Sequence, residues 1–472
     1  MRRIVLTGDC IEALRTMPDA SIDAVVTDPP YGLSQHGAAD TAECLRAWVE
    51  GREYRHGKGG FMGRQWDAWV PGPEVWREVL RVLKPGGHAL VFAGTRTVDL
   101  MGIALRLSGF EIRDSLHWLY GTGFPKSHNI GKAIDKAAGA EREVVGVNPT
   151  WRPNKQNHED NGWRGMVPGE AAVISAPATP EAAQWEGWGT ALKPAHEPII
   201  LARKPLDGTV VDNVLRHGVG GLNVGGCRVA HAERQSFTMR SAPRYSGAVM
   251  NAGKAGGRQP LIAGPAAAGR WPPNIILTHA PDCPGDRNGA GCVDGCAVGE
   301  LGAQSGVRVS TGGDTQSSES GVSVGWMSGT RANQGGVGDI GTAARFFPSF
   351  RYCAKASRSE REAGLTPPAP GKRANRHPTV KPIEMMRWLV RLVTPPGGTV
   401  LDPFTGSGTT GCAAALEDLA FVGCELSPEH ADLARRRVAH WAGGTGSEVV
   451  APTVTPAQDE APGVPPRQLA LL

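Results

Sequence analysis

The sequence lacks the features of a membrane or secreted protein. No apolar run in its 472 residues approaches the roughly 20 residues of a membrane helix, and its N-terminal residues become polar too early for a signal peptide. The nine cysteines are odd in number and mostly scattered, which argues against a disulfide framework. The formal net charge of +4 does not indicate a nucleic-acid binder, so a local basic face would have to provide such binding. We therefore expect a soluble cytoplasmic protein.

Glycine and proline are abundant, at 64 and 37 residues, and hydrophobic residues make up 40% of the chain. The chain is too long for one ordinary domain, and it is apolar enough to bury a core. Glycine, serine, arginine, asparagine and proline are densest between Leu206 and Ala344, where regular periodicity is hard to find. That stretch is either a flexible insertion or a variable recognition region built mainly from loops.

Elsewhere, short apolar runs alternate with segments of helical periodicity. We expect strands at 4–7, 22–27, 88–92, 110–119, 199–202, 399–401 and 420–424. We expect helices at 11–17, 73–83, 98–108, 384–393, 409–416 and 428–441. Lys84 to Gly87 is predicted to form the turn after the helix at 73–83. Such alternation predicts an α/β fold with a mostly parallel, doubly wound sheet.

A glycine turn follows one of these strands near the C-terminal end. Asp402 ends the strand, and Gly406-Ser407-Gly408 leads into the next helix. Glycines let a backbone approach a ligand where a Cβ would clash. Glu425 ends the next strand roughly 20 residues later, which suits a carboxylate that binds ribose hydroxyls. A plain tight turn stays open, whereas a nicotinamide or flavin site is disfavoured because Asp402-Pro403-Phe404 stands where a dinucleotide fingerprint has its first glycine.

The tetrapeptide Asp28-Pro29-Pro30-Tyr31 follows the strand expected at 22–27. The exocyclic amine of adenine or cytosine is a poor nucleophile because its lone pair is delocalised into the ring. The Asp28 carboxylate and the Pro29 carbonyl can accept hydrogen bonds from such an amine, and Tyr31 offers a flat face to a flipped base. The residues alone also allow an ordinary turn after a strand.

Together, the two motifs resemble those of the amino DNA methyltransferases that use S-adenosylmethionine, specifically the β group of phage- or prophage-like members. Further matching strings are 8–10, 82–87, 118–127, 191–198 and 377–382. The resemblance implies a permuted Rossmann-like methyltransferase with a loop-rich recognition insertion. By position, it implies a catalytic half at 1–205, a target recognition region at 206–344, a cofactor-binding half at 345–442 and a disordered tail at 443–472.

The resemblance also assigns roles to residues. Asp28, Pro29, Pro30 and Tyr31 would handle the base, with Asp28 nearest the chemistry. Asp9 would approach the cofactor adenine, although a simple helix N-cap is the alternative. Thr379 and Lys381 would hold the methionine end of the cofactor, because a carboxylate there needs a hydroxyl and a cation, and His377 would make no contact. The other cofactor-binding residues would be Asp402, Phe404, Thr405, Gly406, Ser407, Gly408 and Glu425.

Two loops carry basic residues that suit DNA contacts. In the insertion, Arg228, Arg234, Arg240, Arg244, Arg258 and Arg270 suit phosphates and guanine edges, although each alone is more often a solvated surface cation. Residues 34–69, directly after the tetrapeptide, form a basic and aromatic loop that either closes over a flipped base or lies mobile on the surface.

One cluster has the residue types of a metal site. His279, Cys283, Cys292 and Cys296 fit a tetrahedral structural zinc. Free surface thiols are the alternative, because the spacing is not a clean pair of Cys-x-x-Cys motifs.

These motifs predict a site-specific methyltransferase that acts on adenine-N6 of a flipped base in double-stranded DNA. Aspartate rather than serine at position 28 favours adenine, and cytosine-N4 is the alternative. No cysteine stands in a Pro-Cys context after a strand, which argues against cytosine-C5 chemistry. Methylation of a protein amide or of an RNA amine stays open, and so does a DNA-binding protein without turnover. A homodimer and a cognate restriction enzyme are left open as partners.

Overall fold

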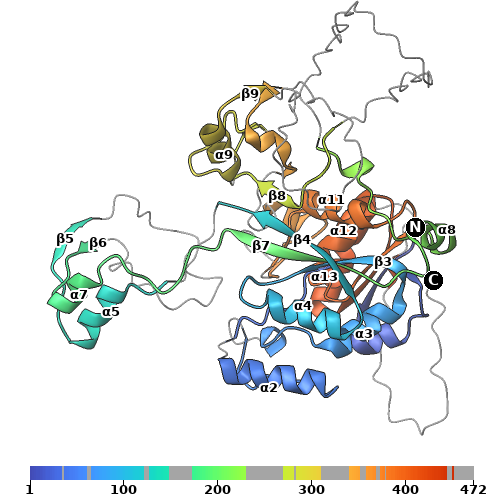
Figure 1. The fold of residues 1–472 in the computed structure, drawn as a ribbon, viewed down its shortest axis with the longest axis horizontal. Coiled ribbons are helices and arrows are strands. Elements are labelled where there is room, and N and C mark those ends of the chain that lie inside the picture. Colours follow the sequence, from blue (N-terminus) through green and yellow to red (C-terminus); the bar gives the residue numbers. More distant parts are fainter. Residues whose placement is uncertain are drawn as a thin grey trace, which may run out of the picture. The chain divides into compact units, whose positions relative to one another are not determined.

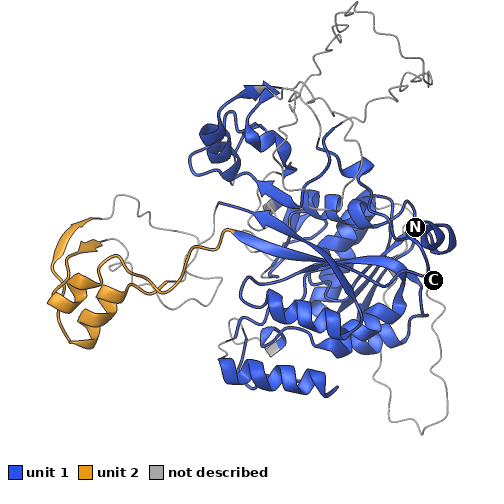
Figure 2. Ribbon diagram, viewed as in Figure 1, with its two compact units in different colours: residues 1–121, 196–472 blue, residues 122–195 orange. Residues whose placement is uncertain are grey.

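The computed structural model describes residues 1–34, 37–60, 65–121, 127–147, 173–229, 269–280, 283–286, 288–309, 340–350, 358–367, 373–377, 379–443 and 449–450. The chain divides into two compact units (Figure 2). The first contains Met1–Gly121 and His196–Leu472, and the second is Thr122–Ala195.

A ten-stranded sheet forms the centre of the first unit, in the order β11-β8-β4-β7-β3-β2-β12-β13-β1-β14. In chain order the strands are β1 (Arg3–Thr7), β2 (Ile22–Thr27), β3 (Leu83–Phe92), β4 (Glu111–Leu119), β7 (His196–Arg203), β8 (Ile275–Thr278), β11 (Ser349–Phe350), β12 (Thr399–Asp402), β13 (Ala420–Glu425) and β14 (Val449–Val450). Strand β7 runs antiparallel to its neighbours β3 and β4, and the other pairings in this sheet are parallel. The predicted mostly parallel sheet is confirmed.

Helices cover both faces of this sheet, as a doubly wound fold requires (Figure 1). Those of the first unit are α1 (Cys10–Arg15), α2 (Ala38–Val49), α3 (Pro73–Val82), α4 (Val98–Leu107), α8 (Val210–His217), α9 (Ala297–Ser305), α10 (Arg358–Glu362), α11 (Ile383–Val393), α12 (Thr409–Leu416) and α13 (Pro428–Trp441), with short 3₁₀ turns η2 (Gln65–Asp67), η3 (Gly225–Cys227) and η4 (Ala343–Phe346). In β2, Val25 packs into the core shared with α3 and α4, whereas Ala24 and Val26 pack into the core shared with α11 and α12. The alternation along the strand therefore fills a core on each side.

The two ends of the chain complete one sheet. Strand β12 pairs with β2, with Val400 opposite Ala24, and β13 pairs with β1, with Gly423 opposite Val5. The C-terminal strands thus lie between the two N-terminal ones. This interleaving is the arrangement that a permuted Rossmann-like chain predicts.

Lys84 to Gly87 was predicted to form a turn between the preceding helix and the next strand. This prediction is wrong, because β3 already begins at Leu83. The register against β2 shifts between the pairs Ile22–Leu83 and Ala24–His88, so the intervening residues form a bulge inside the strand. Gly86 has a φ of 77°, and a Cβ there would lie 2.2 Å from the side-chain nitrogen of Asn213. The glycine signal therefore marks a bulge that α8 fills, not the end of an element.

The segment from 206 to 344 contributes more regular structure than its composition suggests. Its described parts include α8, α9 and the strand β8, which joins the large sheet beside β4. A small antiparallel pair, β9 (Arg308–Val309) with β10 (Ile340–Gly341), follows α9. Most of the tail predicted to be disordered lies outside the described residues, but Val449–Val450 within it pairs with β1 as β14.

The second unit was not separated by the sequence, which placed it inside the catalytic half. It contains α5 (Ile130–Ala137), β5 (Val144–Val147), β6 (Val173–Ser175) and α7 (Pro180–Gln184), and β5 pairs antiparallel with β6. Asp135 accepts hydrogen bonds from the backbone of Ala178 and Thr179 and pairs with Arg142 at 2.9 Å. Within the described residues of both units, no helix has the length and apolarity needed to cross a membrane. The predicted domain boundaries remain predictions.

Candidate functional site

Four neighbouring parallel strands end at the same edge of the sheet. Asp28 follows β2, Asp402 ends β12, Glu425 ends β13, and Asp9 follows β1. The backbone N–H of Gly8 donates to the Glu425 carbonyl at 3.0 Å, which ties the ends of β1 and β13 together. The carboxyl ends of parallel strands are where open α/β sheets bind ligands, so both predicted motifs meet at a favourable place.

Asp402 fixes the glycine turn from inside the protein. Its side chain is buried, one carboxylate oxygen accepts from Thr27 Oγ1 at 2.6 Å and the other from Thr410 Oγ1 at 2.6 Å. The backbone N–H of Phe404 also donates to it at 3.1 Å. Burial raises the pKa of Asp402 to about 6, because these three hydrogen bonds only partly offset the lost solvation. Asp402 therefore shapes the turn.

Asp402 predicts a measurable pH dependence of stability. Its pKa is raised to about 6 from 3.8, so between these values the folded chain binds more protons than the unfolded chain. The wild-type free energy of unfolding should therefore fall, relative to that of Asp402→Asn, by on the order of 3 kcal/mol as the pH rises from about 4 to about 7. Urea unfolding of both proteins at several pH values measures this difference. A difference that stays constant with pH would contradict the assignment.

The rest of the turn is held by close packing. Gly406 has a φ of 53°, and a Cβ there would lie 2.9 Å from the His377 ring. Gly408 has a φ of 79°, and a Cβ there would lie 2.9 Å from the Cβ of Ala434. Thr405 Oγ1 donates to the Asp402 carbonyl at 2.8 Å, and Ser407 Oγ accepts from Arg437 Nη1 at 3.0 Å. Both hydroxyls are thus used within the protein, and the glycines are required by packing.

Three other predicted cofactor residues lie around this turn. The Glu425 carboxylate accepts from the backbone N–H groups of Gly406 and Ser427, each at 2.9 Å, and burial raises its pKa. Asp9 is exposed and caps α1, accepting from the Ile11 N–H at 2.8 Å, so the N-cap alternative is observed. The ring of Phe404 is half-buried against core residues that include Trp76.

The tetrapeptide after β2 is part of a cluster of four polar side chains. Tyr31 OH lies 2.8 Å from Asp28 Oδ1 and 2.9 Å from Glu197 Oε2. Lys381 Nζ lies 3.0 Å from Asp28 Oδ1, 2.9 Å from Glu197 Oε2 and 3.1 Å from Tyr31 OH. We call Asp28, Tyr31, Glu197 and Lys381 the polar cluster.

The opposite charges in the polar cluster stabilise one another. Burial alone would lower the pKa of Lys381, but the two carboxylates outweigh it and hold that pKa above its usual range. Burial and the same carboxylates raise the pKa of Tyr31, so its hydroxyl keeps its proton. Among the described residues no donor reaches Asp28 Oδ2, because the contacts of this side chain all use Oδ1. One oxygen of Asp28 is therefore left to accept from another molecule.

The backbone of the tetrapeptide is fixed from the following loop. Asp67 Oδ1 accepts from the N–H groups of Tyr31 and Gly32, at 3.0 and 3.2 Å, and Thr97 Oγ1 donates to the Tyr31 carbonyl at 2.7 Å. Pro29 is buried, and Pro30 is half-buried. The segment 34–69, predicted as a loop, contains the helix α2. Its Asp67, together with Thr97 before α4, positions the tetrapeptide, and the predicted closure of the segment over a base stays a prediction.

Comparison with known families settles the family. The family model described as DNA methylase, for N6 and N4 methyltransferases, matches residues 22–220 and 309–436, which is more than half of the chain. The chain belongs to this DNA methylase family. The predicted resemblance is confirmed at that level.

Individual relatives match over smaller shares of the chain. The Type II methyltransferase M.HindIII of Haemophilus influenzae is 23% identical over 247 residues, 46% of this chain and 64% of the relative. The DNA adenine methyltransferase YhdJ of Escherichia coli K12 is 39% identical over 62 residues, 13% of this chain and 21% of the relative. Among solved structures, the cytosine-N4-specific PvuII DNA methyltransferase is 12% identical to this chain, with a TM-score of 0.37. The match covers 92% of this chain and 85% of that one. The chain spans less than two-thirds of the length of M.HindIII and of YhdJ.

Sequence reasoning missed Glu197. The residue stands near the start of β7, and because β7 is antiparallel, its N-terminal end lies where the parallel strands have their carboxyl ends. Lys381 was expected at the cofactor's methionine end, but its ammonium contacts Asp28 and Glu197. The nearby Thr379 is exposed, and its carbonyl lies 2.8 Å from Nδ1 of the buried His377. A charged residue beside a proline in the string His196-Glu197-Pro198 was the available signal.

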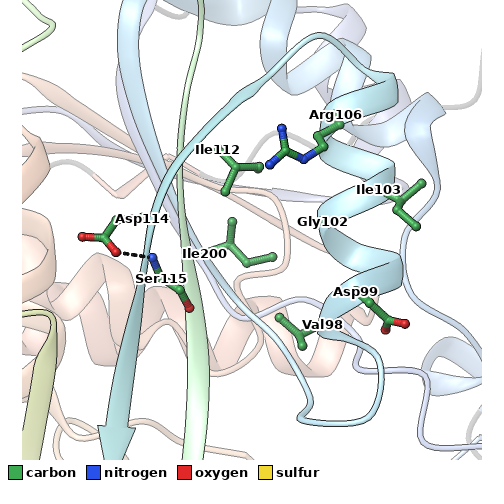
Figure 3. Close-up of a pocket in the computed structure, with 9 residues that line it drawn as sticks. All are labelled: Val98, Asp99, Gly102, Ile103, Arg106, Ile112, Asp114, Ser115 and Ile200. Atoms are coloured by element: carbon green, nitrogen blue, oxygen red, sulfur yellow. Dashed lines mark hydrogen bonds between the residues drawn. The ribbon is translucent and has the colours of Figure 1, made fainter. Parts of the chain in front are cut away.

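Other features of the chain lie apart from these residues. The hollow in Figure 3 lies between α4 and the strands β4 and β7, and no predicted site residue lines it. Of the arginines predicted to contact DNA, Arg228 and Arg270 are described, with guanidinium groups 5.6 Å from the ring centre of Trp271 and 4.6 Å from that of Phe346. Arg234, Arg240, Arg244 and Arg258 lie outside the described residues. The predicted metal-ligand set does come together, with ligand atoms of His279, Cys283, Cys292 and Cys296 all within 4.8 Å of one another.

Proposed function

We propose that this chain transfers a methyl group from S-adenosyl-L-methionine to the N6 amine of a flipped adenine in double-stranded DNA. The observation that carries the proposal is the free oxygen of Asp28, held next to Lys381 at the sheet edge that also carries Asp402 and Glu425. Membership in the DNA methylase family supports the reaction class. The name of the relative YhdJ, a DNA adenine methyltransferase, agrees with this reaction.

The residues around the glycine turn fit the cofactor. Each oxygen of Glu425 accepts one backbone N–H and keeps a second lone pair, so it can accept from ribose hydroxyls. Asp9 is exposed beside it and can accept from an adenine amine, and the half-buried ring of Phe404 can pack against the base. Asp402, Thr405, Gly406, Ser407 and Gly408 would contribute by fixing the turn. When bound, S-adenosylmethionine supplies a methyl group already activated by its sulfonium.

The polar cluster then has to prepare the nucleophile. Asp28 Oδ2 and the Pro29 carbonyl accept the two hydrogens of the target amine, which draws its lone pair out of conjugation with the ring. Tyr31 offers its ring face to the flipped base, while its hydroxyl stays bonded to Asp28 and Glu197. The nitrogen gains a methyl group and loses one proton, which leaves through Asp28 to solvent. Lys381 holds the Asp28 side chain in its orientation throughout.

The choice of adenine rests on the aspartate at position 28, and cytosine-N4 is the alternative within the same family. A cytoplasmic location, a homodimer, a cognate restriction enzyme and the phage- or prophage-like character remain predictions from the sequence. The proposal itself needs only this chain, cofactor and duplex DNA.

Incubation of the purified chain with labelled S-adenosylmethionine and mixed-sequence duplex DNA tests the proposal. We expect labelled N6-methyladenine after digestion to nucleosides, and long-read sequencing of DNA from expressing cells should give its sequence context. Detection of labelled N4-methylcytosine instead would show that cytosine, not adenine, is the target base. Parallel reactions with RNA and protein serve as controls, and label in either of them alone, or in none of the substrates, would overturn the proposal.

A further inference from the structure

A compact group of one histidine and three cysteines lies between β8 and α9 (Figure 1). His279 directly follows β8, Cys296 precedes the first residue of α9, and Cys283 and Cys292 lie in the loop between them. His279 Nδ1 lies 3.8 Å from Cys283 Sγ, 3.4 Å from Cys292 Sγ and 3.6 Å from Cys296 Sγ. The histidine nitrogen thus faces all three sulfur atoms at nearly equal distances.

Hydrogen bonding does not account for this geometry. A neutral imidazole nitrogen carries one hydrogen or one lone pair, so it can satisfy only one of the three sulfur atoms. The three cysteines are also free thiols, which removes a disulfide as the reason for their approach. A tetrahedral zinc ion with usual Zn–S and Zn–N bonds would place nitrogen and sulfur about 3.6 Å apart. The three observed distances lie around that value.

The four side chains are largely enclosed by the protein. His279, Cys283 and Cys296 are buried, and Cys292 is partly buried. The backbone N–H of Ala280 donates to Cys296 Sγ at 3.3 Å. Such N–H···S bonds are the outer-shell contacts that orient metal-bound sulfur. One nitrogen and three sulfur atoms gathered in one enclosed space are the donor set of a structural zinc ion.

We propose that His279, Cys283, Cys292 and Cys296 hold one structural Zn²⁺ ion. Four protein ligands fill a tetrahedral shell, so no position stays open for substrate or water, as catalysis would need. An iron–sulfur cluster has several iron atoms between its ligands and would hold their ligand atoms further apart than the 4.8 Å found here. Binding releases the thiol protons to solvent and joins β8 to α9.

The ion would stabilise a part of the fold that has few apolar contacts of its own. Its core consists of six buried residues, three of which are Leu277, Val298 and Ala344. Strand β8 in turn supports β4, because Trp118 Nε1 donates to Thr278 Oγ1 at 3.3 Å. The Trp118 ring centre lies 5.9 Å from Lys381 Nζ. Strand β8 and the proposed zinc ligands after it therefore support the polar cluster through Trp118. The metal site does not depend on the proposed methylation.

Metal analysis of the full-length protein tests the site. We expect one zinc per chain after purification without added chelator. Cys296→Ser and Cys283→Ser should each lose most of this zinc, whereas Cys227→Ser, a substitution of another buried cysteine, should retain it. Wild-type protein that binds on the order of 0.1 zinc or less per chain, even after dialysis against zinc, would overturn the proposal.

A second measurement applies even where a variant fails to fold. Wild-type protein stripped with a chelator and loaded with Co²⁺ should show the visible absorption of tetrahedral thiolate coordination, and Zn²⁺ should displace it. The stripped protein should also melt at a lower temperature than the zinc form, with recovery on adding Zn²⁺. Absence of the cobalt bands, or iron in place of zinc, would contradict the assignment. Neither readout requires methyltransferase activity.

Discussion

Replacement of Asp28 by alanine is expected to abolish methyl transfer to DNA while cofactor binding persists. The substitution removes Asp28 Oδ2, an oxygen that no described residue uses, and leaves the glycine turn and Glu425 untouched. Loss of a polar group that acts directly on the reacting nitrogen costs about 10³-fold in rate, within the usual range for such catalysis. Transfer of labelled methyl groups measures the rate, and calorimetric titration with S-adenosylmethionine measures binding.

Asp99→Ala is the matched control for this experiment. Asp99 is exposed in the first turn of α4, so its loss should leave both readouts near wild type. Asp28→Asn adds a second comparison, because it keeps the size of the side chain and an oxygen acceptor but lacks the charge that Lys381 pairs with. Full activity of Asp28→Ala would contradict the role of this residue. Equal loss of activity and of cofactor binding would point to a damaged sheet edge instead.

Substitution of Lys381 by methionine should reduce turnover about 10²-fold at neutral pH, with partial recovery as the pH rises. In the wild type the ammonium separates Asp28 from Glu197, at 3.0 and 2.9 Å. Without it two neighbouring carboxylates share the hydroxyl of Tyr31, so one of them takes up a proton and Asp28 is less often charged. Raising the pH restores the charged form. Loss of the buried cation also destabilises the protein by about 3 to 5 kcal/mol.

The same variant separates two roles for Lys381. If the ammonium held the cofactor carboxylate, as the sequence predicted, Lys381→Met would weaken cofactor binding and leave the pH profile unchanged. In the polar cluster it should lower kcat, shift the pH profile upward and leave the cofactor Kd near wild type. Glu197→Gln should show a smaller loss, because Asp28 and Lys381 remain paired. Lys132→Met, at an exposed position of α5, serves as the control for loss of a lysine.

Local patterns predicted most of this fold. The bounds of β2, α12 and α13 agree with those expected, because glycine, proline or polar residues mark the ends of each element. The glycines at 406 and 408 and the acid at 425 also marked a sheet edge correctly, since all three depend on signals within one stretch of chain.

Other features needed the third dimension. The antiparallel direction of β7, which brings Glu197 to Asp28, has no local signature in the sequence, because strand direction is set by pairing with β3 and β4. The pairing of Lys381 with Asp28 and Glu197 also has no local signature, because the three residues lie far apart in the sequence. The bulge at Gly86 was mistaken for a turn because both require glycine at a positive φ.

The interleaved sheet has a consequence for how the chain folds during synthesis. Thr27 Oγ1 bonds to Asp402, which is 375 residues further along the chain, and β1 and β2 stay apart until β12 and β13 arrive between them. The first strands to leave the ribosome therefore cannot complete their sheet before nearly the whole chain is made. Contacts of such long range slow folding and leave strand edges exposed to aggregation in the meantime. We therefore expect the N-terminal half of this chain to need chaperone protection more than a protein whose strands pair in order of synthesis.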